Sequence, residues 1–136
     1  MDGPGGVLRL HHVALPFPGT AEAADDARRF YTDVLGLGEL RAPEILAADV
    51  VWFAVGDQEV HLYAEPSSVA VNEESTRHPC FRVADLSAVR ERLAGLGVET
   101  IDGLPEVPGR PRFFVRDPVG NALEFLELTQ ADGGDA

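Results

Sequence analysis

Apolar and polar positions alternate near the start of the chain and then change to a helical spacing. Residues Leu8 to Phe17 alternate and are rich in apolar side chains, which predicts a strand that ends at Pro18-Gly19. From Ala21 to Leu35 the apolar residues recur at steps of three and four, which predicts a helix with Thr20 as its N-cap. Three short apolar strands are then predicted at residues 40–41, 50–55 and 60–64.

The second half of the chain repeats this order of elements. His78 to Val83 reads as a strand, and the apolar stripe from Leu86 to Leu96 predicts a helix with Asp85 as its N-cap. Three further strands are predicted at residues 98–101, 112–116 and 122–128. Because each half has the order β-α-β-β-β, the pattern indicates an internal duplication and the α+β class.

The duplication sets the expected domain organisation. The first βαβββ module is predicted at residues 7–65, a polar linker at 66–77, and the second module at 78–128. Residues 129–136 contain nothing to bury and are predicted to form a disordered tail. A module of about 65 residues buries little surface by itself. We therefore expect both modules to belong to one domain.

Composition narrows the function classes. The net charge of −12 comes from 23 acidic residues against 11 arginines and no lysine, which argues against binding to nucleic acids or anionic membranes. Cys80 is the single cysteine, so no internal disulfide is possible, and it is expected to be a small buried hydrophobe. Neither a signal peptide nor a membrane span is indicated. The sequence favours a cytoplasmic enzyme or binding protein.

Candidate metal ligands occur at matching places in the two halves. His12-Val-Ala-Leu-Pro-Phe opens the first module and His78-Pro-Cys-Phe-Arg-Val opens the second, while His61 and Glu124 lie in the last strands. A single histidine in a strand is more often a hydrogen-bonded core residue than a ligand, but its recurrence favours metal binding. Three nitrogens and one oxygen would suit Zn, Fe(II), Mn, Co or Ni rather than calcium.

The chain resembles the vicinal oxygen chelate superfamily, which contains glyoxalase I, methylmalonyl-CoA epimerase, fosfomycin-resistance enzymes, extradiol dioxygenases and bleomycin-binding proteins. The resemblance rests on the two histidine motifs and on residues 29–37 and 116–124. It implies a curved mixed sheet around a central metal cavity, with the helices outside. It also implies that the metal ligands come from the first and last strand of each module, here His12, His61, His78 and Glu124.

One position departs from the best-known members of this superfamily. Lyases and epimerases of the superfamily commonly have Glu or Gln at the end of the first module, where this chain has His61. If His61 faces the substrate instead, His12, His78 and Glu124 remain as the two-histidine, one-carboxylate triad of non-haem iron oxygenases. The superfamily's dioxygenases are usually longer, with four modules. The sequence is compatible with both ligand sets.

Further residues are candidates for moving a proton or for lining the cavity. Glu124 is the main candidate for a carboxylate that moves a proton, and Glu59 is a weaker one. His11 is expected to point away from His12. Three aromatic residues could line the cavity beside the metal, although aromatic residues in strands are more often core. These residues are Trp52, Tyr63 and Phe114.

The resemblance predicts a metal-dependent lyase or isomerase of the glyoxalase type. Its substrate would be a small molecule that chelates a divalent metal through two neighbouring oxygens. The alternatives are a ring-cleaving dioxygenase and a non-catalytic protein that sequesters a drug or toxin. A homodimer is expected from the family, and no nucleic-acid or membrane partner is expected.

Overall fold

The computed structural model describes residues 4–65 and 75–129. In the first half the elements are β1 (His12–Phe17), α1 (Ala21–Arg28), the π-helix η1 (Arg29–Val34), β2 (Gly38–Leu40), β3 (Val50–Val55) and β4 (Gln58–Ala64). In the second half they are β5 (Cys80–Arg82), α2 (Leu86–Gly95), β6 (Ile101–Asp102), β7 (Arg112–Arg116) and β8 (Ala122–Leu126). The described residues fall into two compact units that divide between residues 69 and 70.

The two units have the same sheet topology. The strand order is β1-β4-β3-β2 in the first sheet and β5-β8-β7-β6 in the second. In each sheet the first and last strands of the module are parallel neighbours, and the other pairs are antiparallel. The predicted class, α+β with two tandem βαβββ modules, is confirmed.

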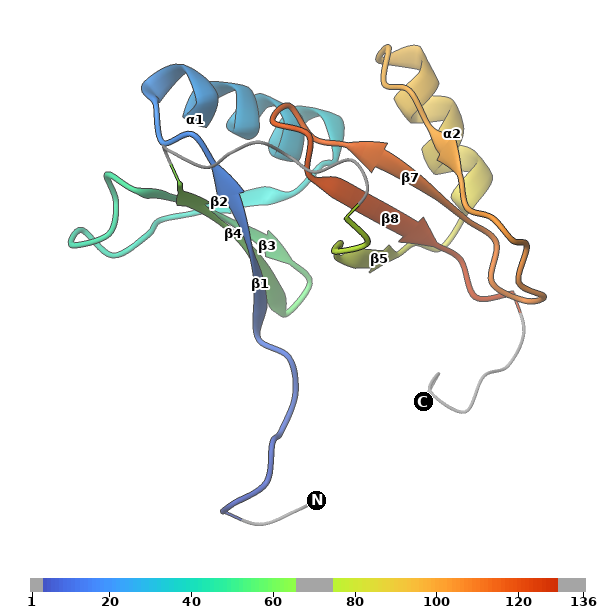
Figure 1. The fold of residues 1–136 in the computed structure, drawn as a ribbon, viewed down its shortest axis with the longest axis horizontal. Helices are drawn as coiled ribbons and strands as arrows, with labels where there is room; N and C mark the ends of the chain where they lie inside the picture. Colours follow the sequence, from blue (N-terminus) through green and yellow to red (C-terminus); the bar gives the residue numbers. More distant parts are fainter. Residues whose placement is uncertain (1–3, 66–74, 130–136) are drawn as a thin grey trace. The chain divides into compact units, whose positions relative to one another are not determined.

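Each sheet buries one face beneath a helix (Figure 1). In the first unit Tyr31 of η1 stacks on Phe53 of β3 with ring centroids 4.9 Å apart, and both side chains are completely buried. In the second unit Leu93 of α2 and Phe113 of β7 are equally inaccessible, and the Arg90 guanidinium lies 4.7 Å from the centre of the Phe113 ring. Each unit therefore has its own hydrophobic core.

The predicted helix starts are correct. The Thr20 hydroxyl accepts a hydrogen bond from the backbone N–H of Ala23 at 3.1 Å, and the Asp85 carboxylate accepts one from Ala88 at 3.0 Å. The first helix continues to Val34 but changes its hydrogen-bonding pattern at Arg29, where the wider π-helical turn begins. Side-chain periodicity alone does not reveal this change.

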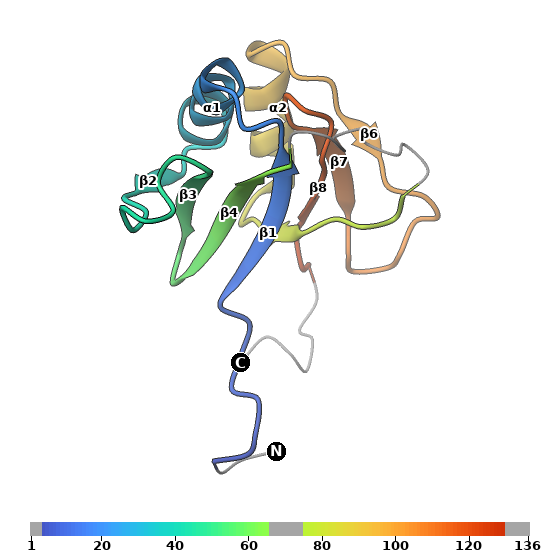
Figure 2. The ribbon, with the colours of Figure 1, turned by 60° about the vertical axis from the view of Figure 1, so that its left-hand side comes forward.

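Four strands, β1, β5, β6 and β8, are shorter than the sequence pattern predicts. β5 begins at Cys80, so His78 precedes it, and β8 ends at Leu126. β1 begins at His12 rather than at Leu8, and the apolar side chains Val7, Leu8 and Leu10 are 89%, 88% and 77% exposed. Figure 2 shows this segment extending beyond the first sheet. Its neighbour β4 begins only at Gln58, so the preceding residues of the first strand have no ladder to join. β6 is limited to two residues for a similar reason, since it pairs with only two residues of β7.

Parts of two other predictions lie outside the described residues. These are positions 66–74 of the expected linker and 130–136 of the expected tail. Within the described part of the chain, no helix combines the length and the apolar character needed to cross a lipid bilayer.

Candidate functional site

The candidate ligands lie on the face of each sheet that does not carry the core. In β4, Glu59, His61 and Tyr63 alternate with the buried Val60 and Leu62. Side chains of paired strands that are in register share a face, and His12 of β1 is in register with Glu59. His12 and His61 therefore project from the same side of the first sheet.

The strand registers show which residues of the two units are equivalent. His61 is in register with Ala14 of β1 and Trp52 of β3, whereas Glu124 is in register with Cys80 of β5 and Phe114 of β7. His61 and Glu124 thus occupy equivalent last-strand positions. His12 stands two residues before Ala14, and His78 stands two residues before Cys80.

Three aromatic rings stack in the first unit. The His61 ring lies between the His12 ring, at 4.0 Å and 18°, and the Trp52 ring, at 4.0 Å and 6°. Tyr63 lies at the margin of this group, 6.2 Å from His61. Only 3% of His61 is exposed, so its ring is fixed on both faces and shielded from solvent.

The two nitrogens of His61 have different environments. Its Nε2 lies 2.7 Å from Oε1 of Glu59, while its Nδ1 is buried and has no hydrogen-bond partner among the described residues. The hydrogen bond from His61 lowers the pKa of the Glu59 carboxyl, which therefore remains ionised at neutral pH. A buried imidazole nitrogen with no partner is the kind of donor atom that a metal ion could use.

His12 and His11 are in contact, so the expectation that His11 points away was wrong. Their Nδ1 atoms are 2.9 Å apart. His11 precedes β1, so the alternation of a strand does not govern its direction. Burial, followed by the nearby His61 and His11, lowers the pKa of His12 and keeps its imidazole neutral at neutral pH. A neutral imidazole is the form that binds metals.

The second unit brings His78 and Glu124 together. Nε2 of His78 lies 2.8 Å from Oε1 of Glu124, and Nδ1 lies 2.7 Å from the carbonyl oxygen of Thr76. Both neighbours are acceptors, whereas a neutral imidazole has only one N–H to donate. With Nδ1–H donated to Thr76, the contact between Nε2 and the carboxylate needs a positive charge, either a proton or a metal cation. The donor chemistry of this pair therefore fits a divalent metal ion.

Two neighbours of Glu124 were not expected from the sequence. Nε of Arg112 lies 3.6 Å from Oε2 of Glu124, and both side chains are largely buried. Cys80 is exposed, so the prediction of a buried cysteine was wrong. Partial covering of the thiol and the Glu124 charge raise the pKa of Cys80 to about 11. The two-residue alternation of β7 contained a signal for Arg112, because it places Arg112 and Phe114 on one face.

The described residues 4–65 and 75–129 contain no group of three or more histidine, cysteine, aspartate or glutamate side chains arranged to hold a metal ion. Each unit instead supplies a pair. The aromatic residues predicted for the pocket are not in either core: Trp52 and Tyr63 contact His61, and the Phe114 ring packs edge-on against His78 at 5.0 Å.

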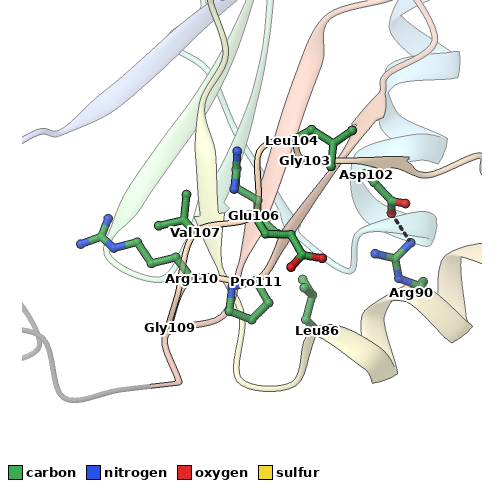
Figure 3. A pocket seen from close by; sticks show the side chains of 11 residues that line it. Leu86, Arg90, Asp102, Gly103, Leu104, Glu106, Val107, Gly109, Arg110 and Pro111 are labelled. Atoms are coloured by element: carbon green, nitrogen blue, oxygen red, sulfur yellow. Dashed lines mark ion pairs between the residues drawn. The ribbon is translucent and has the colours of Figure 1, made fainter.

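A cavity of about 460 Å³ lies in the second unit, between the start of α2 and the loop that follows β6. Arg90 and Asp102 form an ion pair at 3.3 Å on one side of it, and Arg110 extends away from this pair (Figure 3). Arg112 lines the cavity and also contacts Glu124. The cavity is thus adjacent to the second ligand pair, which does not itself line it.

Comparisons with known proteins give consistent results. The profile of the Glyoxalase/Bleomycin resistance protein/Dioxygenase superfamily matches residues 9–125. A glyoxalase family protein from Bacillus anthracis is 31% identical, with a TM-score of 0.81 over 93% of this chain and 99% of that chain. A comparison with curated protein sequences finds no significant match.

Two further solved structures represent different activities. Lactoylglutathione lyase from Agrobacterium tumefaciens is 25% identical, with a TM-score of 0.66 over 93% of this chain and 96% of that chain. TnmS3, an antibiotic binding protein from Streptomyces sp. CB03234, is 21% identical, with a TM-score of 0.69 over 90% of this chain and 97% of that chain. The second likeness concerns the fold alone.

Proposed function

Because the chain belongs to the Glyoxalase/Bleomycin resistance protein/Dioxygenase superfamily, we propose that it is a metal-dependent lyase or isomerase of the glyoxalase type. Its ligands would be His12 and His61 from the first unit and His78 and Glu124 from the second. The substrate would be a small molecule with two neighbouring oxygens, and the metal would be one of Zn, Fe(II), Mn, Co or Ni.

One observation carries this proposal. In each unit, a histidine two residues before the first-strand partner of the last-strand ligand lies in contact with that ligand, His12 with His61 and His78 with Glu124. Nδ1 of His61 is buried without a partner among the described residues, and both ring nitrogens of His78 face oxygen acceptors. Two core histidines with purely structural roles would not require this repetition.

The side chains have distinct parts in the proposed reaction. When bound, the metal supplies a Lewis acid that stabilises negative charge on substrate oxygen. Glu124 accepts a proton from substrate carbon on a carboxylate oxygen and returns it to a neighbouring position. Arg112, whose Nε lies 3.6 Å from Oε2, helps to orient the Glu124 carboxylate. Trp52 and Phe114 exclude water beside the histidines.

The first test is elemental analysis of protein purified without added metal, followed by reconstitution with each candidate ion. We expect one transition metal ion for each set of four ligands. Absence of stoichiometric metal, together with no binding on reconstitution, would exclude the enzyme proposal. Loss of a hemithioacetal would then support the lyase, and oxygen consumption with catechols would instead identify a dioxygenase.

A protein that sequesters a drug or toxin is the second candidate. The observation that favours it is the stack of His12, His61 and Trp52, because exposed margins of stacked rings suit flat aromatic ligands. Such a protein would bind its ligand equally well after treatment with a chelator. The proposed enzyme would lose both metal and activity under the same treatment.

A further inference from the structure

The contact between Glu59 and His61 suggests a role for Glu59 that differs from acid–base catalysis. We propose that Glu59 is a positioning residue that holds a proton on Nε2 of His61, so that Nδ1 is the nitrogen available to a metal ion. This inference rests on the proposed function, because it concerns one of the four proposed ligands. Its first test nevertheless needs no metal.

The hydrogen bond determines where the proton lies. Oε1 of Glu59 is 2.7 Å from Nε2 of His61, and an ionised carboxylate can only accept. Nε2 must therefore carry the hydrogen, and in a neutral imidazole Nδ1 then carries the lone pair. The His61 side chain is 4% exposed, so water competes little for this bond.

The packing of the ring leaves Glu59 as the group that selects between the two nitrogens. His12 and Trp52 lie 4.0 Å away and stack on opposite faces of the His61 ring, which restricts its tilt. Nδ1 has no partner among the described residues, and a buried acceptor without a donor is destabilising. A metal ion at Nδ1 would remove that penalty.

Metal-binding histidines commonly donate their other N–H to a carboxylate or carbonyl, and losing that partner lowers metal affinity by about 10–100-fold. Glu59 stands in this relation to His61, and Thr76 does so for His78, whose Nδ1 lies 2.7 Å from the Thr76 carbonyl oxygen. The contact with His61 engages Oε1 of Glu59.

Nitrogen-15 NMR of histidine-labelled, metal-free protein tests the proton position directly. Long-range proton–nitrogen correlations distinguish the two tautomers, and a His61→Phe variant assigns the signals. We expect the Nε2–H form in the wild-type protein and in Glu59→Gln, whose amide oxygen can still accept. Glu59→Ala should give a mixture of both forms. Glu44→Ala, which removes an exposed carboxylate of the same unit, should change nothing.

Zinc affinity, measured by competition with a chelator, provides the second measurement. Glu59→Ala should weaken binding by about 10–100-fold, and Glu59→Gln by less than about tenfold. An Nδ1–H tautomer in the wild-type protein, or an unchanged tautomer in Glu59→Ala, would overturn the inference. If Glu59→Ala does not fold, loss of the Nε2–H form in folded Glu59→Gln would overturn it. If the wild-type protein binds no zinc or other candidate metal, the proposed function fails, whereas the tautomer still decides the inference.

Discussion

The two units place different chemical groups at equivalent positions of the same topology. His12, at the start of β1, corresponds to His78, two residues before β5, but the last strand presents His61 in one unit and Glu124 in the other. His61 is sandwiched between rings and nearly inaccessible, whereas Glu124 contacts a histidine on one oxygen and Arg112 on the other.

This difference follows from the cost of burying each group. A neutral imidazole can be buried between aromatic rings if its N–H finds an acceptor, which Glu59 provides. A carboxylate needs positive charge or hydrogen-bond donors when it leaves water, and His78 and Arg112 meet that need. A duplicated scaffold thus keeps the ligand position while the supporting residues change with the ligand.

Truncation of the two cores should have the largest effect. Phe53→Ala and Phe113→Ala each remove a fully buried ring, so each should lower the free energy of unfolding by about 3–5 kcal/mol. Urea denaturation measures both, and Ile45→Ala, at a residue that is 91% exposed, is the control. If one Phe variant were close to wild type, the cores of the units would not be equivalent.

Removal of the first-strand histidines should affect metal binding more than folding. We expect His12→Ala and His78→Ala each to weaken metal affinity by more than about 100-fold. Losing a ligand's hydrogen-bond partner already weakens metal affinity by up to about 100-fold, and losing the ligand itself should cost more. Isothermal titration gives the affinity, and thermal unfolding without metal checks the fold. An unchanged affinity in either variant would remove that histidine from the ligand set.

Cys80 should react slowly because partial burial, followed by the charge of Glu124, raises the pKa of its thiol from 9.0 to about 11. At pH 8 this higher pKa lowers the thiolate fraction by about 100-fold. A thiolate of higher pKa is also more nucleophilic, so the reaction rate should fall by only about tenfold. Alkylation by iodoacetamide measures the rate. Glu124→Gln should accelerate it, since removing the negative charge lowers the pKa.

The equivalent position in the first unit offers a matched control for Cys80. Ala14 is in register with His61 as Cys80 is with Glu124. In a Cys80→Ala background, Ala14→Cys should react faster than wild-type Cys80, because its cross-strand neighbour carries no negative charge. Equal rates at the two positions would contradict this electrostatic explanation.

Removal of the helix N-caps should have the smallest effect. Thr20→Ala should lower the free energy of unfolding by about 1 kcal/mol. Asp85→Ala should cost less, because Glu127 also caps α2 by accepting from the Leu86 N–H at 2.7 Å. Chemical denaturation measures both variants. A larger loss of unfolding free energy in Asp85→Ala than in Thr20→Ala would contradict the second cap provided by Glu127.

Local patterns predicted much of the fold. The strands at 50–55 and 112–116 and both N-caps were correct to the residue, because alternation and capping depend on neighbours within a few positions. The start of β1, the two-residue β6 and the contact between His11 and His12 were not predicted. These depend on where a partner strand begins and on backbone direction outside the strand.

The sequence by itself determined the duplication, the order of elements and the pairs of candidate ligands, because the same pattern of apolar residues and histidines occurs in both halves. Only the tertiary structure decided that His61 is stacked and bound to Glu59, that Arg112 contacts Glu124, and that Cys80 is exposed. The physical reason is that alternation assigns a residue to a face of a sheet. Register, ring packing and the geometry of hydrogen bonds then decide which atoms on that face meet.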